Sequence, residues 1–265
     1  MGGQVLCYVL QRIAFMCEEQ ESVYGNSGLE SGEDEMKVAV ITAYYKEDLN
    51  TLARCHKSVV GQTYKEVTHF MVADGHARDY VDEWGCEHIK MPNCADAGDT
   101  PRVVGYAVAA ARGFDAVCFL DADCWLEPEH ISTLVGVMTE SGAPVVTCPR
   151  NLYHLDGSFM AVDTESDGRA FNDTNCYLLH RNAFQLCMAW IHKPPNSSLI
   201  GDRYFWLNVC QSGVRLARSL KPTVNYTTSF AFHYQQHGLP VPDHAKVIAD
   251  LGDGFKTYNH KELTT

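Results

Sequence analysis

The chain has 265 residues, and 46% of them are hydrophobic, which is enough for one α/β domain with a sizeable core. Its 33 acidic residues against 21 basic ones give a net charge of −12, and this balance argues against nucleic acid as a partner because phosphate contacts need basic side chains. The 11 cysteines include no C-x-x-C pair, so we expect buried, reduced thiols in a cytoplasmic protein.

The first 35 residues differ in composition from the rest of the chain. The apolar segment Val5–Cys17 is shorter than the ~20 residues of a membrane span, and it is typical of an amphipathic helix, which leaves a peripheral membrane location as an alternative. Residues 18–35 are rich in Glu, Ser and Gly and are typical of a linker. We therefore predict an N-terminal extension at 1–35 and a folded domain at 36–265.

Strands and helices are expected to alternate after Met36. The hydrophobic patterns predict strands at 37–42, 67–73, 86–91, 116–120 and 145–148, and helices at 49–61, 102–112 and 127–140. This alternation predicts an α/β fold with a mostly parallel central sheet and helices on both faces.

Polar residues end three of the predicted strands. Thr42, Asp74 and Asp121 should lie at one edge of the sheet, where α/β proteins bind their ligands. Asp121 and Asp123 are separated by the small Ala122, so both carboxylates can turn toward one site and, together with a diphosphate, bind Mg²⁺ or Mn²⁺. The alternative is a strand-end turn in which one aspartate caps the following helix.

Several segments resemble family-2-type inverting glycosyltransferases, which have the GT-A fold. Residues 37–75 are similar to the opening of that family, with the closest match at Ser58–Tyr64, and residues 107–123 resemble its helix, glycine turn and acidic strand end. The resemblance extends from about Met36 to His233. It implies a nucleotide-binding half at 36–150 and an acceptor half at 151–265.

The resemblance also implies a nucleotide-sugar site. Its nucleoside contacts would come from Thr42, Ala43, Tyr44, Glu47 and Asp74, and its ribose and diphosphate contacts from Arg102, Asp121 and Ala122. Asp123 would be the principal metal ligand, with Asp121 as a second one. A UDP-sugar is the favoured donor, although Ala73 replaces an acid that the family carries beside Asp74. A solvated surface position is the alternative for Arg102.

The remaining implied roles lie later in the chain. Asp202, in register with a following Trp–Leu pair, corresponds to the catalytic base, and Gly201 replaces the acid that precedes it in the family. The alternative for Asp202 is a helix N-cap. Asp173 and Asn175 would contact the acceptor or the donor sugar. His233, with His237 as the alternative, would complete the metal or diphosphate site.

These patterns predict a glycosyltransferase that moves a sugar, with inversion and with Mn²⁺ or Mg²⁺, to a saccharide, lipid-linked or protein acceptor. One alternative is a GT-A-like binding protein with a degraded site, which the departures at Ala73 and Gly201 favour. Another is a sugar-nucleotide pyrophosphorylase, but the loop at 43–48 lacks the glycines that this activity requires. A D-x-D-x-T phosphatase is disfavoured because Trp125 stands at the threonine position.

Overall fold

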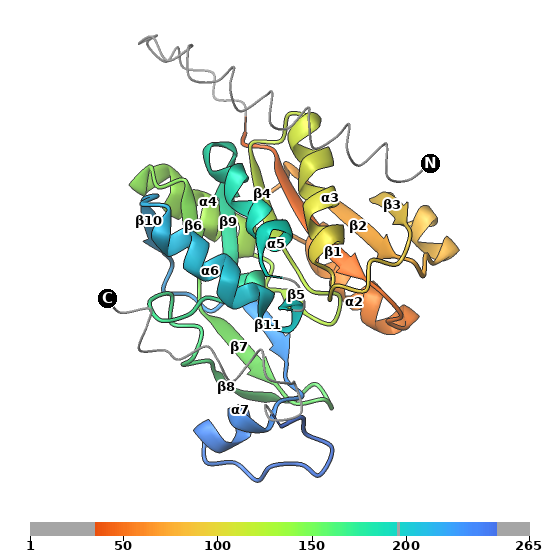
Figure 1. Cartoon of the computed structure of the whole chain (residues 1–265), viewed down its shortest axis with the longest axis vertical. Helices are drawn as coiled ribbons and strands as arrows, with labels where there is room; N and C mark the ends of the chain where they lie inside the picture. Colours follow the sequence, from red (N-terminus) through yellow and green to blue (C-terminus); the bar gives the residue numbers. More distant parts are fainter. Residues whose placement is uncertain (1–34, 195–196, 248–265) are drawn as a thin grey trace. The chain divides into compact units, whose positions relative to one another are not determined.

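The computed structural model describes residues 35–194 and 197–247 (Figure 1). The predicted extension at 1–35 therefore lies outside the described residues except for Glu35. A compact unit begins at Met36. Its strands are β1 (Val38–Tyr44), β2 (Val67–Asp74), β3 (Glu87–Met91), β4 (Ala116–Phe119), β5 (Trp125–Leu126), β6 (Val145–Thr147), β7 (Arg150–Tyr153), β8 (Phe159–Val162), β9 (Tyr177–His180), β10 (Leu216–Arg218) and β11 (Val224–Thr227).

The helices fall between these strands and after them. The α-helices are α2 (Leu49–Val60), α3 (Asp99–Ala111), α4 (His130–Ser141), α5 (Ala189–His192), α6 (Gly201–Gln211) and α7 (Ala231–Gln236). The 3-10 helices are η2 (Asp79–Glu83), η3 (Thr174–Cys176), η4 (Arg181–Met188) and η5 (Ser198–Ile200). No helix within the described residues has the length and apolar character needed to cross a membrane.

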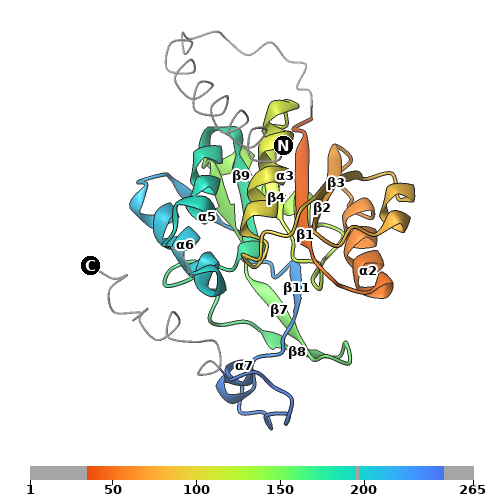
Figure 2. The ribbon, with the colours of Figure 1, turned by 45° about the vertical axis from the view of Figure 1, so that its right-hand side comes forward.

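The larger sheet has seven strands in the order β10-β6-β9-β4-β1-β2-β3 (Figures 1 and 2). All neighbouring strands are parallel except β9, which is antiparallel to both β4 and β6. The predicted mostly parallel sheet is therefore confirmed. Strands β9 and β10 come from the predicted acceptor half, so the division at residue 150 does not separate two sheets.

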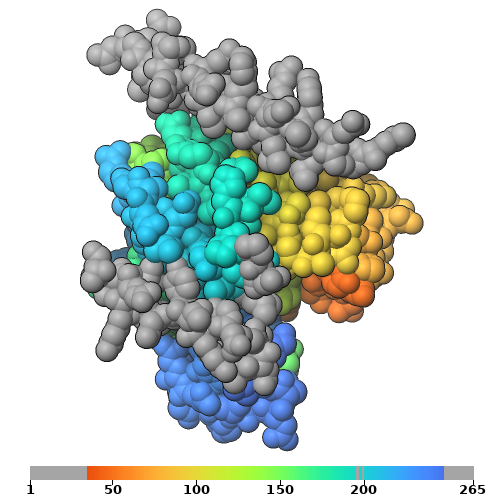
Figure 3. Space-filling model, in the orientation of Figure 1, coloured from red at the N-terminus to blue at the C-terminus, as the bar shows by residue number. Residues whose placement is uncertain are grey.

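Alternate residues of β1 face opposite sides of the sheet, and helices cover both sides. Ala39 and Ile41 belong to a core cluster with side chains of α3, α5 and α6, whereas Val38 and Val40 belong to a cluster with side chains of α2 and α4. The space-filling view shows α3, α5 and α6 side by side on one face (Figure 3). Because both faces are buried, the strands read as continuous apolar runs.

Helix α3 begins three residues earlier than its apolar pattern predicts, at Asp99 instead of Arg102. Gly98 precedes it with a φ of 84°, a left-handed conformation that glycine adopts without strain, and Pro101 fits the first turn. Gly105 lets α3 lie close to the sheet, since a Cβ there would be 2.5 Å from Ile41 Cγ2. The early start brings Asp99 to the carboxyl edge of the sheet.

A smaller sheet, in the order β5-β11-β7-β8, continues from this edge (Figure 1). Strand β5 follows directly after the Asp121–Asp123 segment, and β7 begins at Arg150, shortly after β6. The polar ends of the large sheet therefore lie next to residues of the smaller one.

Candidate active site

The three predicted strand ends lie at one edge, because β1 pairs in parallel with both β2 and β4. Their side chains nevertheless have different surroundings. Thr42 is completely buried, and its hydroxyl group bonds His69 Nε2 at 2.9 Å and contacts Cys55 Sγ at 3.6 Å. The hydroxyl of Thr42 therefore faces the core, and a nucleoside contact at this position would have to use the backbone.

Tyr44 is also held inside the protein. Its hydroxyl lies 2.7 Å from His88 Nε2 and accepts the backbone N–H of Arg78, and burial raises its pKa to about 12. Ala122 is buried in the same small apolar cluster as Tyr44. Because both side chains are packed in this one cluster, a nucleotide contact at Tyr44 or Ala122 would have to come from the backbone.

Other predicted nucleoside contacts lie nearer the surface or anchor a loop. Ala43 is half-buried at the end of β1, and Glu47, half-buried in the following loop, accepts the backbone N–H of Tyr45 at 2.6 Å. Asp74 is buried, and its Oδ1 accepts the backbone N–H of Cys94 at 2.6 Å. Asp74 thus fixes the loop between β3 and α3.

Asp121 is held by one cation and one amide. The Arg102 guanidinium lies 2.6 Å from Asp121 Oδ1, and Asn175 donates to Asp121 Oδ2 at 2.9 Å. Burial opposes ionisation of Asp121, but Arg102 and then Asn175 offset it and lower the pKa of this carboxyl group. The alternative of a solvated Arg102 is excluded, since its side chain is only 13% exposed.

The Asp123 carboxylate has a weaker hydrogen-bond partner than the Asp121 carboxylate. Its carboxylate accepts a weak bond from the Cys124 thiol, at 3.5 Å. Desolvation by the surrounding protein and then the charge of Asp121 raise the pKa of Asp123 to about 6, although the residue is in contact with solvent.

The carboxylates of Asp121 and Asp123 supply some of the oxygen ligands that a divalent cation needs. Within the described residues, no three His, Cys, Asp or Glu side chains are grouped closely enough to hold a metal ion. A cation beside Asp123 would nevertheless offset the repulsion from Asp121, and ligand oxygens would have to complete its coordination shell. The metal site therefore stays a prediction, with Asp123 as its main protein ligand.

A cavity of about 190 Å³ opens beside Asp121 and reaches α6. Five of the predicted site residues line it, namely Arg102, Asp121, Asp173, Asp202 and His233. Its wall also contains residues that the sequence analysis did not single out, among them Asp99, Arg150 and Glu165. The tertiary structure therefore joins the acidic triplet region to the candidate base in one cavity.

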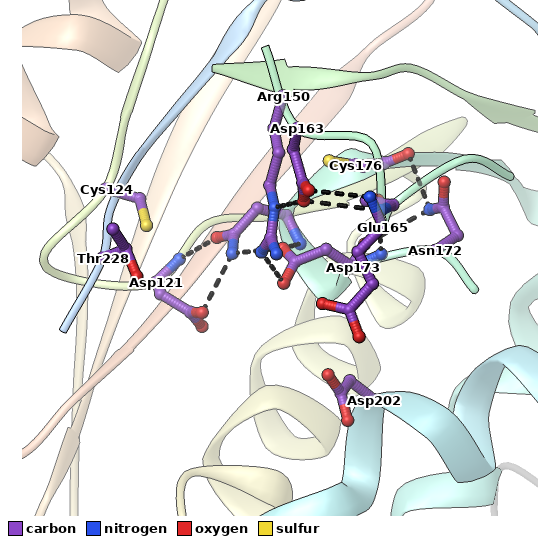
Figure 4. A network of polar contacts seen from close by, with 12 residues as sticks. Asp121, Cys124, Arg150, Asp163, Glu165, Asn172, Asp173, Cys176, Asp202 and Thr228 are labelled. Carbon is purple, nitrogen blue, oxygen red and sulfur yellow. Dashed lines mark hydrogen bonds and ion pairs between the residues drawn. The ribbon is translucent and has the colours of Figure 1, made fainter. Parts of the chain in front are cut away.

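Asp202 lies in the first turn of α6, and its carboxyl group projects toward the network of Arg150 and Asp173 (Figure 4). Its Oδ1 accepts the neighbouring Arg203 N–H at 2.8 Å. Ile200, not Asp202, occupies the N-cap position, so the alternative of a simple helix cap is wrong. Burial raises the pKa of Asp202 to about 6. A carboxylate with this pKa can accept a proton near neutral pH.

A buried ion network forms the wall opposite α6. Arg150 donates to Asp163 Oδ2 at 2.6 Å and pairs with Asp173, and its guanidinium lies over the Tyr226 ring, 4.1 Å from the centroid. Asn175 joins this network to the strand edge, because its amide donates to both Asp173 and Asp121.

This arrangement corrects the predicted roles of Asn175 and Asp173. Asn175 is fully buried, and its amide group is bonded within the protein, so it positions Asp121 instead of contacting the acceptor or the donor sugar. Asp173 lines the cavity, but its carboxylate is shared between Arg150 and Asn175.

The surroundings of His233 do not favour its predicted role as a metal ligand. His233 is buried in α7, with Nδ1 2.6 Å from the Thr228 hydroxyl and Nε2 3.4 Å from the Arg150 guanidinium. Burial and then the charge of Arg150 lower the pKa of His233 to about 3. Both ring nitrogens are engaged, and the neighbouring arginine would repel a cation.

The residues that were missed had weak signals in the sequence. Arg150 stands out only as a charge directly after an apolar strand and a proline. Its partner Asp163 and the cavity residue Glu165, which pairs with Arg203 at 2.6 Å, lie in a segment without a recognisable pattern. Their proximity comes from the smaller sheet, which the hydrophobic pattern after residue 150 did not reveal.

Comparison with known proteins identifies the family. The sequence profile of glycosyl transferase family 2 matches residues 39–200, which is more than half of the chain. The chain therefore belongs to glycosyl transferase family 2. A comparison with curated proteins gives no significant match.

Solved structures of Staphylococcus aureus (S. aureus) TarS are similar to this chain. One TarS structure has a TM-score of 0.58 and 16% identity, covering 76% of this chain and 38% of that one. TarS 1–349 in complex with UDP has a TM-score of 0.53 and 14% identity, and the match covers 76% of this chain and 63% of that one. TarS 1–349 in complex with UDP-GlcNAc has a TM-score of 0.55 and 16% identity, and the match covers 73% of this chain and 59% of that one. The chain thus spans less than two thirds of each TarS structure. The likeness confirms the predicted GT-A fold.

Proposed function

We propose that this protein transfers a sugar from a UDP-sugar to a hydroxyl group of an acceptor, with inversion at the anomeric carbon and with the help of Mn²⁺ or Mg²⁺. The observation that carries the proposal is the cavity in which Asp202 and Asp121 lie together. Family membership and the TarS complexes with UDP and UDP-GlcNAc support the donor class.

Asp202 is the catalytic base of the proposed reaction. Its carboxylate accepts the proton of the acceptor hydroxyl while the hydroxyl oxygen forms a bond to the anomeric carbon. The bond from that carbon to the diphosphate oxygen breaks on the opposite face, and its electron pair leaves with the diphosphate. Attack opposite the leaving group inverts the anomeric configuration. The raised pKa of Asp202, about 6, suits this proton transfer.

Asp121, Asp123 and Arg102 serve the diphosphate end of the donor. Arg102 and Asn175 keep the Asp121 carboxylate ionised and oriented, and each of its oxygens retains a lone pair for a ligand. Asp123 would be the main protein ligand of the metal ion, with Asp121 beside it. A bound divalent ion would stabilise the negative charge of the departing diphosphate.

Binding without turnover is the second candidate function. The departures from the family pattern at Ala73 and Gly201 are the observation that favours it. Against it, the base candidate is retained in a cavity with a pKa suited to catalysis. Release of free sugar or transferred product from a UDP-sugar separates the two functions.

Thermal unfolding with UDP, with and without Mn²⁺, tests the donor and metal assignment. UDP at 100 times its Kd should stabilise the wild type by about 2.7 kcal/mol, provided that Mn²⁺ is present. Asp123→Asn should lose most of the Mn²⁺-dependent part of this stabilisation, whereas Asp79→Asn, which changes a fully exposed carboxylate, should keep it. Equal stabilisation of wild type and Asp123→Asn would reject the metal site.

A further inference from the structure

Asp99 is a buried carboxylate of the cavity wall that the proposed reaction does not use. It is the first residue of α3, and only 2% of it is exposed. Its position depends on the early start of the helix after Gly98. A buried carboxylate is costly to maintain unless bonded partners surround it, so its contacts indicate what it does.

Two cations flank the Asp99 carboxylate. Lys193 Nζ lies 2.6 Å from Oδ2, and Arg102 lies 3.7 Å from Oδ1. Burial nevertheless raises the pKa of Asp99, and the two cations only partly offset this effect. A further hydrogen-bond donor, such as a hydroxyl group of a ligand in the cavity, would improve the environment of this carboxylate.

Gly201 leaves the space that Asp99 occupies. The backbone at Gly201 is helical, with a φ of −58°, so no unusual conformation requires a glycine there. A Cβ at this position would instead lie 2.9 Å from Asp99 Oδ1. Asp99 and a side chain at position 201 would therefore compete for the same volume. The glycine before the candidate base is explained by the carboxylate that reaches this point from α3.

The location of Asp99 identifies the part of the donor that it can reach. It contacts Arg102, which holds Asp121 at the diphosphate end, and it contacts Gly201, the neighbour of Asp202. In the proposed reaction, the anomeric carbon loses its bond to the diphosphate and gains a bond to the acceptor oxygen, which the base deprotonates. The transferred sugar must therefore lie between the diphosphate and the base. In the proposed reaction, Asp99 would therefore lie beside the transferred sugar.

We propose that the Asp99 carboxylate, held by Lys193, forms a subsite that binds a hydroxyl group of the transferred sugar, and that Asp99 replaces a side chain at position 201 in this role. Asp99 lines the cavity and supplies a hydrogen-bond acceptor for a sugar hydroxyl. Lys193 positions this carboxylate, because its ammonium group is bonded both to Asp99 and to the Trp190 carbonyl. The inference rests on the proposed function, since it assumes a UDP-sugar donor.

Calorimetric binding of UDP, UDP-GlcNAc and UDP-glucose in the presence of Mn²⁺ tests the subsite. In Asp99→Asn and Lys193→Gln, the affinity for UDP should stay within about threefold of wild type. The affinity for whichever of the two UDP-sugars binds the wild type more tightly should fall by about 10- to 100-fold. Glu87→Gln, a carboxylate-to-amide change in an ion pair with Arg112, is the matched control and should change neither affinity. Unchanged UDP-sugar affinity in Asp99→Asn would overturn the subsite.

Moving the carboxylate separates a binding role from a structural one. Asp99→Gly should lose the affinity that the sugar adds to UDP. The double variant Asp99→Gly/Gly201→Asp should recover part of it, because a carboxylate from either position reaches the same space in the cavity wall. No recovery in a folded double variant would reject the shared role of the two positions. Failure of the wild type to bind UDP at all would instead refute the proposed function.

Discussion

Asp121 and Asp202 are two aspartates in the wall of one cavity, and their surroundings give them opposite properties. At the strand edge, Arg102 and Asn175 lower the pKa of Asp121 despite its burial. On α6, burial raises the pKa of Asp202 to about 6. Ionisation is therefore favoured at the strand edge, whereas the carboxyl group on α6 changes its protonation near pH 6. Under the proposed function, the strand edge would bind the donor and α6 would carry the proton transfer.

The largest effect should follow from removing the base on α6. Asp202→Asn should lower kcat for sugar transfer by about 10²- to 10⁴-fold, the range expected for loss of a general base, because the amide cannot accept the proton. The Kd for UDP should stay near that of wild type, since the strand edge is unchanged. Transfer kinetics and UDP calorimetry on the same samples measure the two effects.

Asp156→Asn supplies the control for this variant, because Asp156 is an exposed carboxylate in the turn between β7 and β8. It should retain both transfer and binding. If Asp202→Asn kept the wild-type kcat, the separation into a binding region and a proton-transfer region would fail.

The next effect concerns stability and the connection between the two regions. Arg150→Met should destabilise the fold by about 3–5 kcal/mol, because it leaves Asp163 and Asp173 buried without their cation. Arg112→Met, which breaks the half-exposed pair with Glu87, should cost at most about 1 kcal/mol. Denaturant unfolding of both variants measures the difference. Similar costs for the two would show that the Arg150 network does not hold the cavity wall.

The smallest effect is a change in pH dependence. Protonation of Asp202 should lower kcat/KM by about tenfold per pH unit below about 6, because protonated Asp202 cannot accept a proton. Protonation of Asp123, whose pKa is also about 6, would add to this loss by weakening metal binding. A carboxyl group with the ordinary value of 3.8 would keep the activity to much lower pH.

Protonation of Asp202 does not destabilise the folded protein, so acid unfolding caused by this group does not explain the loss of activity. Its folded-state pKa lies above the ordinary value, so proton binding favours the folded state, and this contribution to stability grows as the pH falls through about 6 and is lost as it rises. A constant kcat/KM down to pH 4.5 in folded protein would contradict the assignment of Asp202.

Much of the large sheet was predictable from sequence. Strand β2 begins at Val67 and helix α2 at Leu49, as expected, because apolar periodicity is a local signal. The start of α3 was misplaced because Asp99 is polar, and the apolar pattern begins only after it. The smaller sheet was not predicted, since its strands are short and partly exposed.

The site was predicted unevenly. Asp121 and Asp123 were singled out because they follow a recognisable strand, and Asp202 because the segment around it resembles the family, and their roles stay predictions. The surroundings of Tyr44 and His233 were not predicted, because sequence does not show which way a side chain turns, and both side chains are bonded inside the protein. Arg102 was placed in sequence, but only the fold shows that its partner is Asp121.

Sequence by itself determined the family, the parallel sheet and the carboxylates that carry the proposed chemistry, because these depend on local patterns and on residue type. Only the tertiary structure decided which carboxylate is held by a cation and which is not, and it alone brought Asp99 against Gly201 across more than one hundred positions of the chain. The pKa of a carboxyl group depends on burial and on charges within a few ångströms, and the fold sets both.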